Sequence, residues 1–197
     1  MKIATWNVNS VKARIDAVLG WLKEATPDVV GFQEIKCLDE AFPRLEFEAL
    51  GYNVETFGQK TYNGVAILSR HPIEDVTRGL PGFEDTQSRY IEAVIAPKGG
   101  KAIRFCCLYL PNGNPVASEK YPYKLDWMAA LQARVEALLP LEESLVVAGD
   151  YNVIPTPADV HDPAAWAKDA LFLPTTRAAW RRLANLGLTD AIRACNA

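Results

Sequence analysis

The strongest constraint on the fold is an apolar run near residue 150 that ends in polar side chains. Residues 145–148, Leu-Val-Val-Ala, are long enough for a strand that is buried on both faces. Gly149 is expected to end this strand, and Asp150 and Asn152 then point the same way on an extended backbone. Pro155 prevents the strand from continuing. We therefore expect a carboxylate and a carboxamide at the carboxyl end of a strand, where open α/β sheets place ligand sites.

The start of the chain predicts a strand–helix–strand unit. Residues 2–7 and 29–32 are the expected strands, and Pro27 separates the second strand from the helix before it. Ser10 can cap that helix, whose apolar residues recur at helical spacing: Val11, Ile15, Val18, Leu19 and Leu22. Strands joined in this way pair in parallel with a right-handed crossover.

The middle of the chain changes to short strands separated by turn residues. After a short helix at 43–50, strands are expected at 52–57, 65–68, 73–77, 91–95 and 103–110. Their Asn-Gly, Pro-Gly and Gly-Gly connections predict an antiparallel meander. Two further helices are expected at 123–139 and 176–186, with a loop at 153–163. Two groups of strands with helices outside predict two packed sheets in one α/β sandwich domain, residues 1–197.

Composition narrows the class of protein. The 197 residues are 49% hydrophobic and 23% charged, which indicates a globular domain with a sizeable core. A net charge of −3 argues against a module that holds nucleic acid by bulk charge, so a polyanion requires a local basic rim or a metal ion. The sequence lacks a bilayer-spanning run and the apolar core of a signal peptide, and its four cysteines show no zinc spacing. We expect a cytoplasmic monomer with reduced thiols and no membrane partner.

Three predicted strand ends carry polar side chains. Asn7 and Asn9 follow the first strand, Gln33 and Glu34 follow the second, and Asp150 and Asn152 follow the strand near residue 150. Two carboxylates with amide neighbours are hard oxygen ligands that suit Mg²⁺ or Mn²⁺. Each strand end taken alone is also compatible with an ordinary solvated turn, because Gly, Asp and Asn favour turns.

Seven segments, in order along the chain, resemble the exonuclease III family of DNA-repair nucleases, within the wider endonuclease/exonuclease/phosphatase fold. They are Trp6-Asn7-Val8-Asn9-Ser10, Pro27-Asp28-Val29-Val30, Gln33-Glu34-Ile35-Lys36, residues 62–69, residues 108–113, Tyr123-Lys124-Leu125 and Gly149-Asp150-Tyr151-Asn152. The Gly-Asp-x-Asn motif is shared by the whole superfamily. The Gln-Glu-x-Lys and Tyr-x-Pro-Asn-Gly motifs are more particular to the DNA-repair branch.

The resemblance implies a fold and a set of catalytic roles. The fold is the DNase I-like, four-layer sandwich of two mixed sheets flanked by helices. Glu34 is implied to ligate Mg²⁺ with Asn7 close by, and Asp150, held by Asn152, to orient or deprotonate the attacking water. Tyr109 is implied to face the scissile phosphate or the leaving oxygen. On the residues alone, Tyr109 is equally an ordinary strand aromatic.

The same resemblance implies contacts with double-stranded DNA. The implied residues lie in two regions: Tyr62, Asn63, Asn112, Asn114, Lys120 and Lys124. Lysines can hold phosphates and fix the register of a duplex. The alternative for Lys120 and Lys124 is a solvated surface loop.

One departure concerns the end of the sequence. Family members continue into an Arg-Ile/Leu-Asp strand and a terminal Ser-Asp-His, whose Asp-His pair contacts the scissile phosphate. This sequence stops at Cys195-Asn196-Ala197, and its two histidines, His71 and His161, lie outside matching motifs. We therefore expect a fragment with an incomplete second sheet, which alone hydrolyses DNA negligibly.

The expected function is a Mg²⁺-dependent nuclease that acts at abasic sites and at 3′ ends of double-stranded DNA. Two alternatives stay open. One is a phosphatase of the same fold that acts on a small phosphorylated molecule, and the other is a non-catalytic DNA-binding or scaffold module.

Overall fold

The computed structural model describes residues 1–195, which form two compact units. The first unit comprises Met1–Tyr109 and Glu142–Tyr151, and the second comprises Leu110–Leu141 and the described chain from Asn152 onward. Residues 196 and 197, where the sequence stops, lie outside the described residues, and the expectation of a fragment stays a prediction.

The first sheet of the first unit confirms the predicted strand–helix–strand unit. Strands β1 and β2 pair in parallel, and the intervening chain forms a 3₁₀ turn at Lys12–Arg14 followed by helix α1 (Ile15–Ala25). Strand β4 pairs antiparallel with both β2 and β3, which gives the order β1-β2-β4-β3. The bounds are β1 (Ile3–Asn7), β2 (Val29–Gln33), β3 (Asn53–Phe57) and β4 (Val65–Ser69), and the short helix α2 (Arg44–Glu48) precedes β3.

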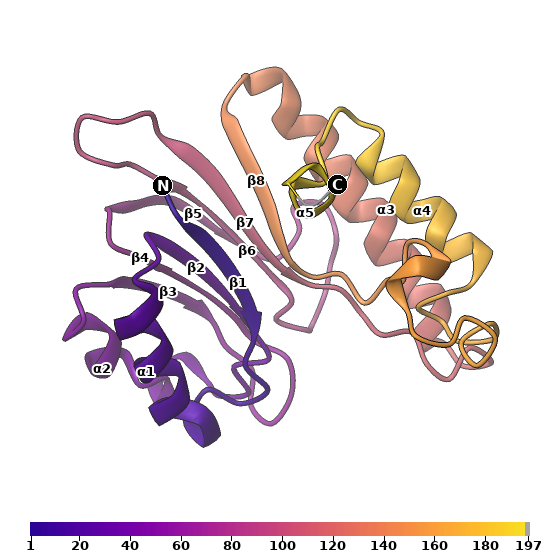
Figure 1. Cartoon of the computed structure of the whole chain (residues 1–197), viewed down its shortest axis with the longest axis horizontal. Helices are drawn as coiled ribbons and strands as arrows, with labels where there is room; N and C mark the ends of the chain where they lie inside the picture. The colour runs from indigo at the N-terminus through magenta and orange to yellow at the C-terminus, as the bar shows by residue number, and fades with distance from the viewer. Residues whose placement is uncertain (196–197) are drawn as a thin grey trace. The chain divides into compact units, whose positions relative to one another are not determined.

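The second sheet has the order β5-β6-β7-β8 and is also mixed (Figure 1). Its strands are β5 (Ile73–Arg78), β6 (Tyr90–Ile95), β7 (Ile103–Tyr109) and β8 (Ser144–Asp150). The first three form an antiparallel meander, and β8 pairs in parallel with β7. The prediction of one meander through all the middle strands is wrong, because β3 and β4 belong to the first sheet. All five residues of β4 are buried, as suits a strand between two others, whereas β5 is partly exposed at an edge.

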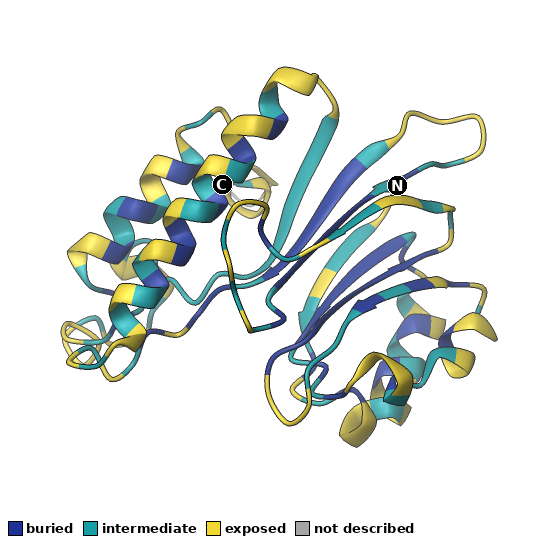
Figure 2. Ribbon diagram, turned by 180° about the vertical axis from the view of Figure 1, so that it is seen from behind, coloured by how far each residue is buried: buried dark blue, intermediate teal, exposed yellow. Residues whose placement is uncertain are grey.

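The alternation of side chains along β2 packs the unit in layers. Val30 and Phe32 join the core beneath helix α1, which contributes Val18 and Leu22. Val29, on the other face, joins a core that includes Ile91 and Phe105 of the second sheet. Because both faces of β2 are covered, all five of its residues are buried, and the inner strands are dark blue in Figure 2. Two mixed sheets flanked by helices confirm the predicted fold class.

Strand β8 differs from its prediction in two ways. It continues through Gly149 to Asp150 instead of ending at the glycine. It is also half-buried along its whole length and lies last in the sheet order, so it is not buried on both faces (Figure 2). Gly149 has φ +149°, and a Cβ at this position would lie 2.0 Å from the carbonyl oxygen of Leu108. Only glycine therefore lets β8 approach β7 at the residue before Asp150.

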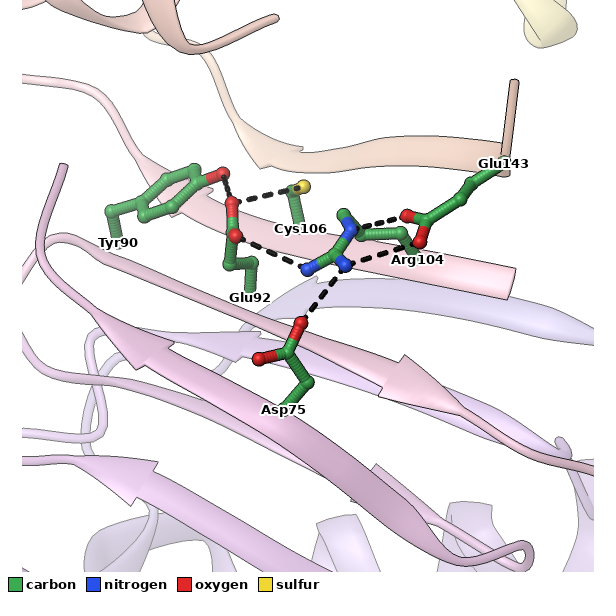
Figure 3. A network of polar contacts seen from close by, with 6 residues as sticks. All are labelled: Asp75, Tyr90, Glu92, Arg104, Cys106 and Glu143. Atoms are coloured by element: carbon green, nitrogen blue, oxygen red, sulfur yellow. Dashed lines mark hydrogen bonds and ion pairs between the residues drawn. The ribbon is translucent and has the colours of Figure 1, made fainter. Parts of the chain in front are cut away.

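Charged side chains on the second sheet form a closed network around one guanidinium (Figure 3). Arg104 of β7 pairs with Glu143 at 2.5 Å, Asp75 of β5 at 2.9 Å and Glu92 of β6 at 3.4 Å. Glu92 is fully buried, and the Tyr90 hydroxyl donates a hydrogen bond to it at 2.5 Å. Burial raises the pKa of Tyr90, so the phenol keeps its proton. Because the ions are paired, the network links three strands and the residue before β8 without leaving a buried charge uncompensated.

The second unit is built from helices and loops. Helix α3 (Lys120–Leu138) packs against α4 (Pro174–Ala184), a short helix α5 (Ala191–Cys195) follows, and the loop before α4 contains a 3₁₀ turn at Pro157–Asp159. Helix α3 begins three residues before its prediction, because Pro122 lies in the first turn, where a missing N–H costs no helical hydrogen bond. Among residues 1–195, the helices lack the length and apolar composition that a membrane span requires.

Lys124 is a buried cation in the second unit. Its side chain is fully buried, and its ammonium donates hydrogen bonds to the carbonyl oxygens of Asn152 at 2.6 Å, Pro111 at 3.1 Å and Asn112 at 3.2 Å. A Cβ on Gly113 would lie 2.6 Å from Cδ of Lys124, so the loop wraps closely around this side chain. The lysine therefore joins the segment after β7 to the segment after β8.

We predict that Gly149→Ala lowers the free energy of unfolding by about 3 kcal/mol, because the new Cβ meets backbone and the φ angle is strained. The matched control is Gly20→Ala in α1, where a Cβ meets no atom within 4 Å. This control is expected to raise the free energy of unfolding by about 0.5–1 kcal/mol. Urea denaturation of both variants measures the difference, and equal stabilities would contradict the close approach of β8.

We also predict that Lys124→Met lowers the free energy of unfolding by about 2 kcal/mol or more, because buried carbonyl oxygens lose their donor. Lys120→Met is the matched control, since Lys120 is exposed on the same helix and its replacement should change stability by less than about 0.5 kcal/mol. Thermal unfolding of the two variants tests the prediction. A stable Lys124→Met protein would show that the ammonium is not needed for folding.

Candidate active site

The carboxyl ends of the two parallel strand pairs meet at one site in the first unit. Asn7 lies opposite Gln33 in the β1–β2 register, and Tyr109 lies opposite Asp150 in the β7–β8 register. The Asn7 side-chain amide donates hydrogen bonds to Glu34 Oε1 at 2.7 Å and to Asp150 Oδ2 at 2.9 Å. The structure thus brings together residues that are up to 143 positions apart in the chain.

Glu34 is the half-buried carboxylate at the end of β2. Its backbone has φ +54°, in the left-handed region that non-glycine residues rarely adopt. Burial by itself raises the pKa of Glu34, but hydrogen bonds from Asn7, Lys36 and Tyr109 outweigh burial and hold the pKa below its usual value. The Lys36 ammonium lies 2.8 Å from Glu34 Oε2. Glu34 is therefore ionised at neutral pH, as a metal ligand must be.

Tyr109 is the last residue of β7, and its phenol is half-buried beside Glu34. Burial, together with the hydrogen bond to Glu34 and the charge of that carboxylate, raises the pKa of Tyr109. The hydroxyl consequently keeps its proton at neutral pH and acts as a hydrogen-bond donor. A protonated phenol at this edge of the sheet can donate to an oxygen of a bound phosphate.

Backbone hydrogen bonds continue beyond the strand ends and fix the loops of the site. The N–H groups of Val8 and Ser10 donate to the carbonyl oxygens of Gln33 and Glu34, at 3.0 and 2.7 Å. The N–H of Lys36 donates to the carbonyl of Asn63 at 3.0 Å. Several non-glycine residues of these loops have positive φ: Asn9, Ser10, Glu34, Lys36 and Asn63. Strained conformations of this kind persist where the surrounding structure holds them, and they gather at functional sites.

The donor set fits a hard divalent cation such as Mg²⁺. Glu34 and Asp150 accept hydrogen bonds from one amide nitrogen, so a cation between them would be close to two carboxylates. Mg²⁺ commonly binds through one or two carboxylates and keeps several waters. The Asn7 amide oxygen accepts the N–H of Asn9 at 3.1 Å, so Asn7 faces the carboxylates with its nitrogen. Within the described residues, three His, Cys, Asp or Glu side chains do not gather at any metal-binding cluster.

The residues expected to contact DNA fall into two groups. Tyr62 has 67% of its surface exposed, and Asn112 and Lys120 are also exposed. Asn63 and Asn114, in contrast, are held by the protein. The Asn63 amide donates to Gln59 and Gln87 at 2.9 and 3.1 Å, and the Asn114 amide donates to both carboxylate oxygens of Asp169.

The expectation that Lys124 contacts a DNA phosphate does not hold in this structure, and a solvated surface loop does not describe it either. The side chain is fully buried, and the ammonium is turned inward onto three backbone carbonyls. One of these carbonyls belongs to Asn152, whose own amide donates to the Leu110 carbonyl at 2.8 Å. Asn152 has φ +45° and lies beyond β8, so the extended alternation expected for Asp150 and Asn152 is wrong.

Arg89 and Gln87 are site residues that sequence reasoning missed. The Arg89 guanidinium carbon lies 4.8 Å from the centroid of the Tyr109 ring, and Gln87 holds the guanidinium by its side-chain oxygen. No short motif or spacing signals this contact, because Arg89 lies 20 positions before Tyr109 and reaches it only through the antiparallel pairing of β6 and β7.

Comparisons with known proteins agree with this geometry. The family model of the endonuclease/exonuclease/phosphatase family matches residues 4–192. Exodeoxyribonuclease III of Haemophilus influenzae is 35% identical over 204 residues, an alignment that covers 100% of this chain and 76% of that protein.

Two solved structures are similar over nearly the whole chain. An AP endonuclease from Archaeoglobus fulgidus has a TM-score of 0.92 and 38% identity, and the match covers 98% of this chain and 74% of that one. A variant of the 3′ phosphatase NExo from Neisseria, solved with a product DNA hairpin, has a TM-score of 0.92 and 37% identity with the same coverage.

The described chain thus has the predicted DNase I-like arrangement of two mixed sheets, with Asn7, Glu34, Tyr109 and Asp150 at one edge. The matched residues include all four of these positions. The chain belongs to the endonuclease/exonuclease/phosphatase family, and within it to the exonuclease III branch of DNA-repair nucleases.

Proposed function

We propose that this protein is a Mg²⁺-dependent phosphodiesterase that cuts double-stranded DNA at abasic sites and removes nucleotides from 3′ ends. The observation that carries the proposal is the Asn7 amide between Glu34 and Asp150, which holds two carboxylates from different sheets at one point. The names of the similar proteins, an exodeoxyribonuclease III and an AP endonuclease, support DNA as the substrate.

Each residue has a separate task in this mechanism. Asp150 orients the attacking water and accepts its proton, while Asn7 fixes the Asp150 carboxylate through Oδ2. Tyr109 donates its phenol proton in a hydrogen bond to a phosphate oxygen. Mg²⁺, when held by Glu34, supplies positive charge that stabilises the negative charge developing on the phosphate.

A second candidate reaction is removal of a 3′ phosphate from DNA. One similar structure is titled a 3′ phosphatase and contains a product DNA hairpin, at 37% identity. The same water-activating carboxylate serves attack on a terminal phosphate and on an internal phosphodiester. Duplexes that carry an abasic site, a recessed 3′ hydroxyl or a 3′ phosphate separate the three activities. An inositol phosphate tests the small-molecule phosphatase, and DNA binding without turnover of any of these substrates would favour a binding module.

We predict that Glu34→Gln reduces Mg²⁺-dependent cleavage of an abasic duplex by about 10²-fold or more, because the amide lacks the charge that holds the cation. The fold should persist, since Gln keeps the shape of Glu34. Single-turnover assays of the full-length protein across a Mg²⁺ titration measure the effect. The matched control is Glu40→Gln, at an exposed glutamate of the same unit, which should cleave as the parent does. Parent-like cleavage by Glu34→Gln in limiting Mg²⁺ would refute the assignment of Glu34.

We predict that Asp150→Asn lowers the single-turnover rate by about 10²–10⁴-fold while DNA affinity changes little, because the variant keeps the shape and loses the proton acceptor. Fluorescence anisotropy with an abasic duplex measures the affinity, and quench-flow measures the rate. Asp126→Asn, on an exposed position of α3, is the control for loss of a carboxylate. A large loss of affinity with an unchanged rate would instead indicate that Asp150 only binds.

A further inference from the structure

The side chain of Arg89 lies flat against the ring of Tyr109. Its guanidinium carbon is 4.8 Å from the ring centroid, within the range of a cation–π contact. The two residues are also joined through the backbone, because Arg89 Nη1 donates to the Tyr109 carbonyl at 3.1 Å and the Tyr109 N–H donates to the Arg89 carbonyl at 2.8 Å. The ring and the cation therefore cannot move independently.

The guanidinium is fixed from its other edge by Gln87. Nε and Nη2 of Arg89 donate to the single side-chain oxygen of Gln87, at 2.9 and 2.7 Å. The same oxygen accepts the Asn63 amide at 3.1 Å. A planar guanidinium held at both edges is a rigid platform, whereas a lysine ammonium is a point charge without a plane.

We propose that Arg89 is a positioning residue that aims the Tyr109 hydroxyl at the reacting phosphate. The inference rests on the proposed function and assigns to Arg89 a task separate from holding DNA. The contacts run in an unbroken series from Asn63 through Gln87 and Arg89 to Tyr109, whose hydroxyl reaches Glu34. A phenol that is rigid in this way loses little freedom in the transition state, and small displacements of catalytic groups cost up to about 10²-fold in rate.

The charge of Arg89 has a second effect on the same phenol. Burial and the Glu34 carboxylate raise the pKa of Tyr109, and the nearby positive charge of Arg89 partly opposes that rise. The hydroxyl is consequently a better hydrogen-bond donor with Arg89 present than without it.

A direct contact between Arg89 and a DNA phosphate makes different predictions from a positioning role. A phosphate contact contributes to affinity, so its loss raises KM and reduces the dependence of affinity on salt by about one unit of slope. Lysine would restore most of that affinity. A positioning residue acts on kcat through Tyr109, and lysine cannot replace it, because lysine cannot both stack on the ring and grip Gln87.

The experiment is a double-mutant cycle in the full-length protein on an abasic duplex with Mg²⁺. Arg89→Met is expected to lower kcat by about tenfold or more with KM and salt slope nearly unchanged, and Arg89→Lys to lower kcat similarly. In the Tyr109→Phe background, Arg89→Met should have less than about a twofold further effect, since its target hydroxyl is gone. Additive losses, or a raised KM that Arg89→Lys restores, would overturn the proposal.

The first unit contains a matched control for the chemical change. The guanidinium carbon of Arg70 lies 5.2 Å from the ring centroid of Tyr52, in an arginine–tyrosine pair built on β3 and β4. Arg70→Met removes an equivalent stacked cation and is expected to leave kcat at the parent value. A fall in kcat equal to that of Arg89→Met would show that the effect is general destabilisation.

A spectroscopic readout separates this inference from the proposed function. In protein labelled at the tyrosine ring carbons, the Tyr109 resonance is assigned by its loss in Tyr109→Phe. Arg89→Met is expected to shift this resonance, and Arg70→Met to leave it in place, whether or not the protein cleaves DNA. An unchanged Tyr109 resonance would refute the positioning role, whereas a shifted resonance in a protein that cleaves none of the tested substrates would refute only the nuclease assignment.

Discussion

The site depends on one amide that lies between two carboxylates. Asn7 donates to Glu34 and to Asp150, which come from different sheets, and so holds together the ends of strands that pack only through apolar faces elsewhere. Two carboxylates this close repel each other, and the repulsion is offset in part by Asn7 and by the Lys36 ammonium on Glu34. The remaining negative charge favours a divalent cation at the same point.

The Arg104 network shows the opposite use of similar groups. There, three carboxylates surround one guanidinium that the chain itself supplies, and the ion pairs are complete within the protein. The network secures the β7–β8 pair near its start, while Gly149 allows close approach near its end. Tyr109 and Asp150, which are paired in register at that end, are therefore held by a strand contact fixed on both sides. Placement of the catalytic groups is a consequence of how β8 pairs with β7.

Lysines and asparagines of the same loop region serve different purposes. Lys120 is exposed and open to a polyanion, whereas Lys124, four residues later on α3, turns inward and binds the backbone of two loops. Asn112 is exposed, whereas Asn114 is held by Asp169. A motif that includes both members of each pair does not tell the contact residue from the structural one. Arg89 is the converse case, since it lies outside every motif and contacts Tyr109 directly.

The sequence by itself determined the α/β class, the parallel β1–β2 unit and the catalytic set, because apolar periodicity and strand-end polar residues are local signals. It did not determine that β3 and β4 join the first sheet, that β8 runs through Gly149, or that Lys124 is buried. Those outcomes depend on which strands pair and on what surrounds each side chain. Arg89 reaches Tyr109 for the same reason, since antiparallel pairing aligns residues 20 positions apart, and only the tertiary structure decides that pairing.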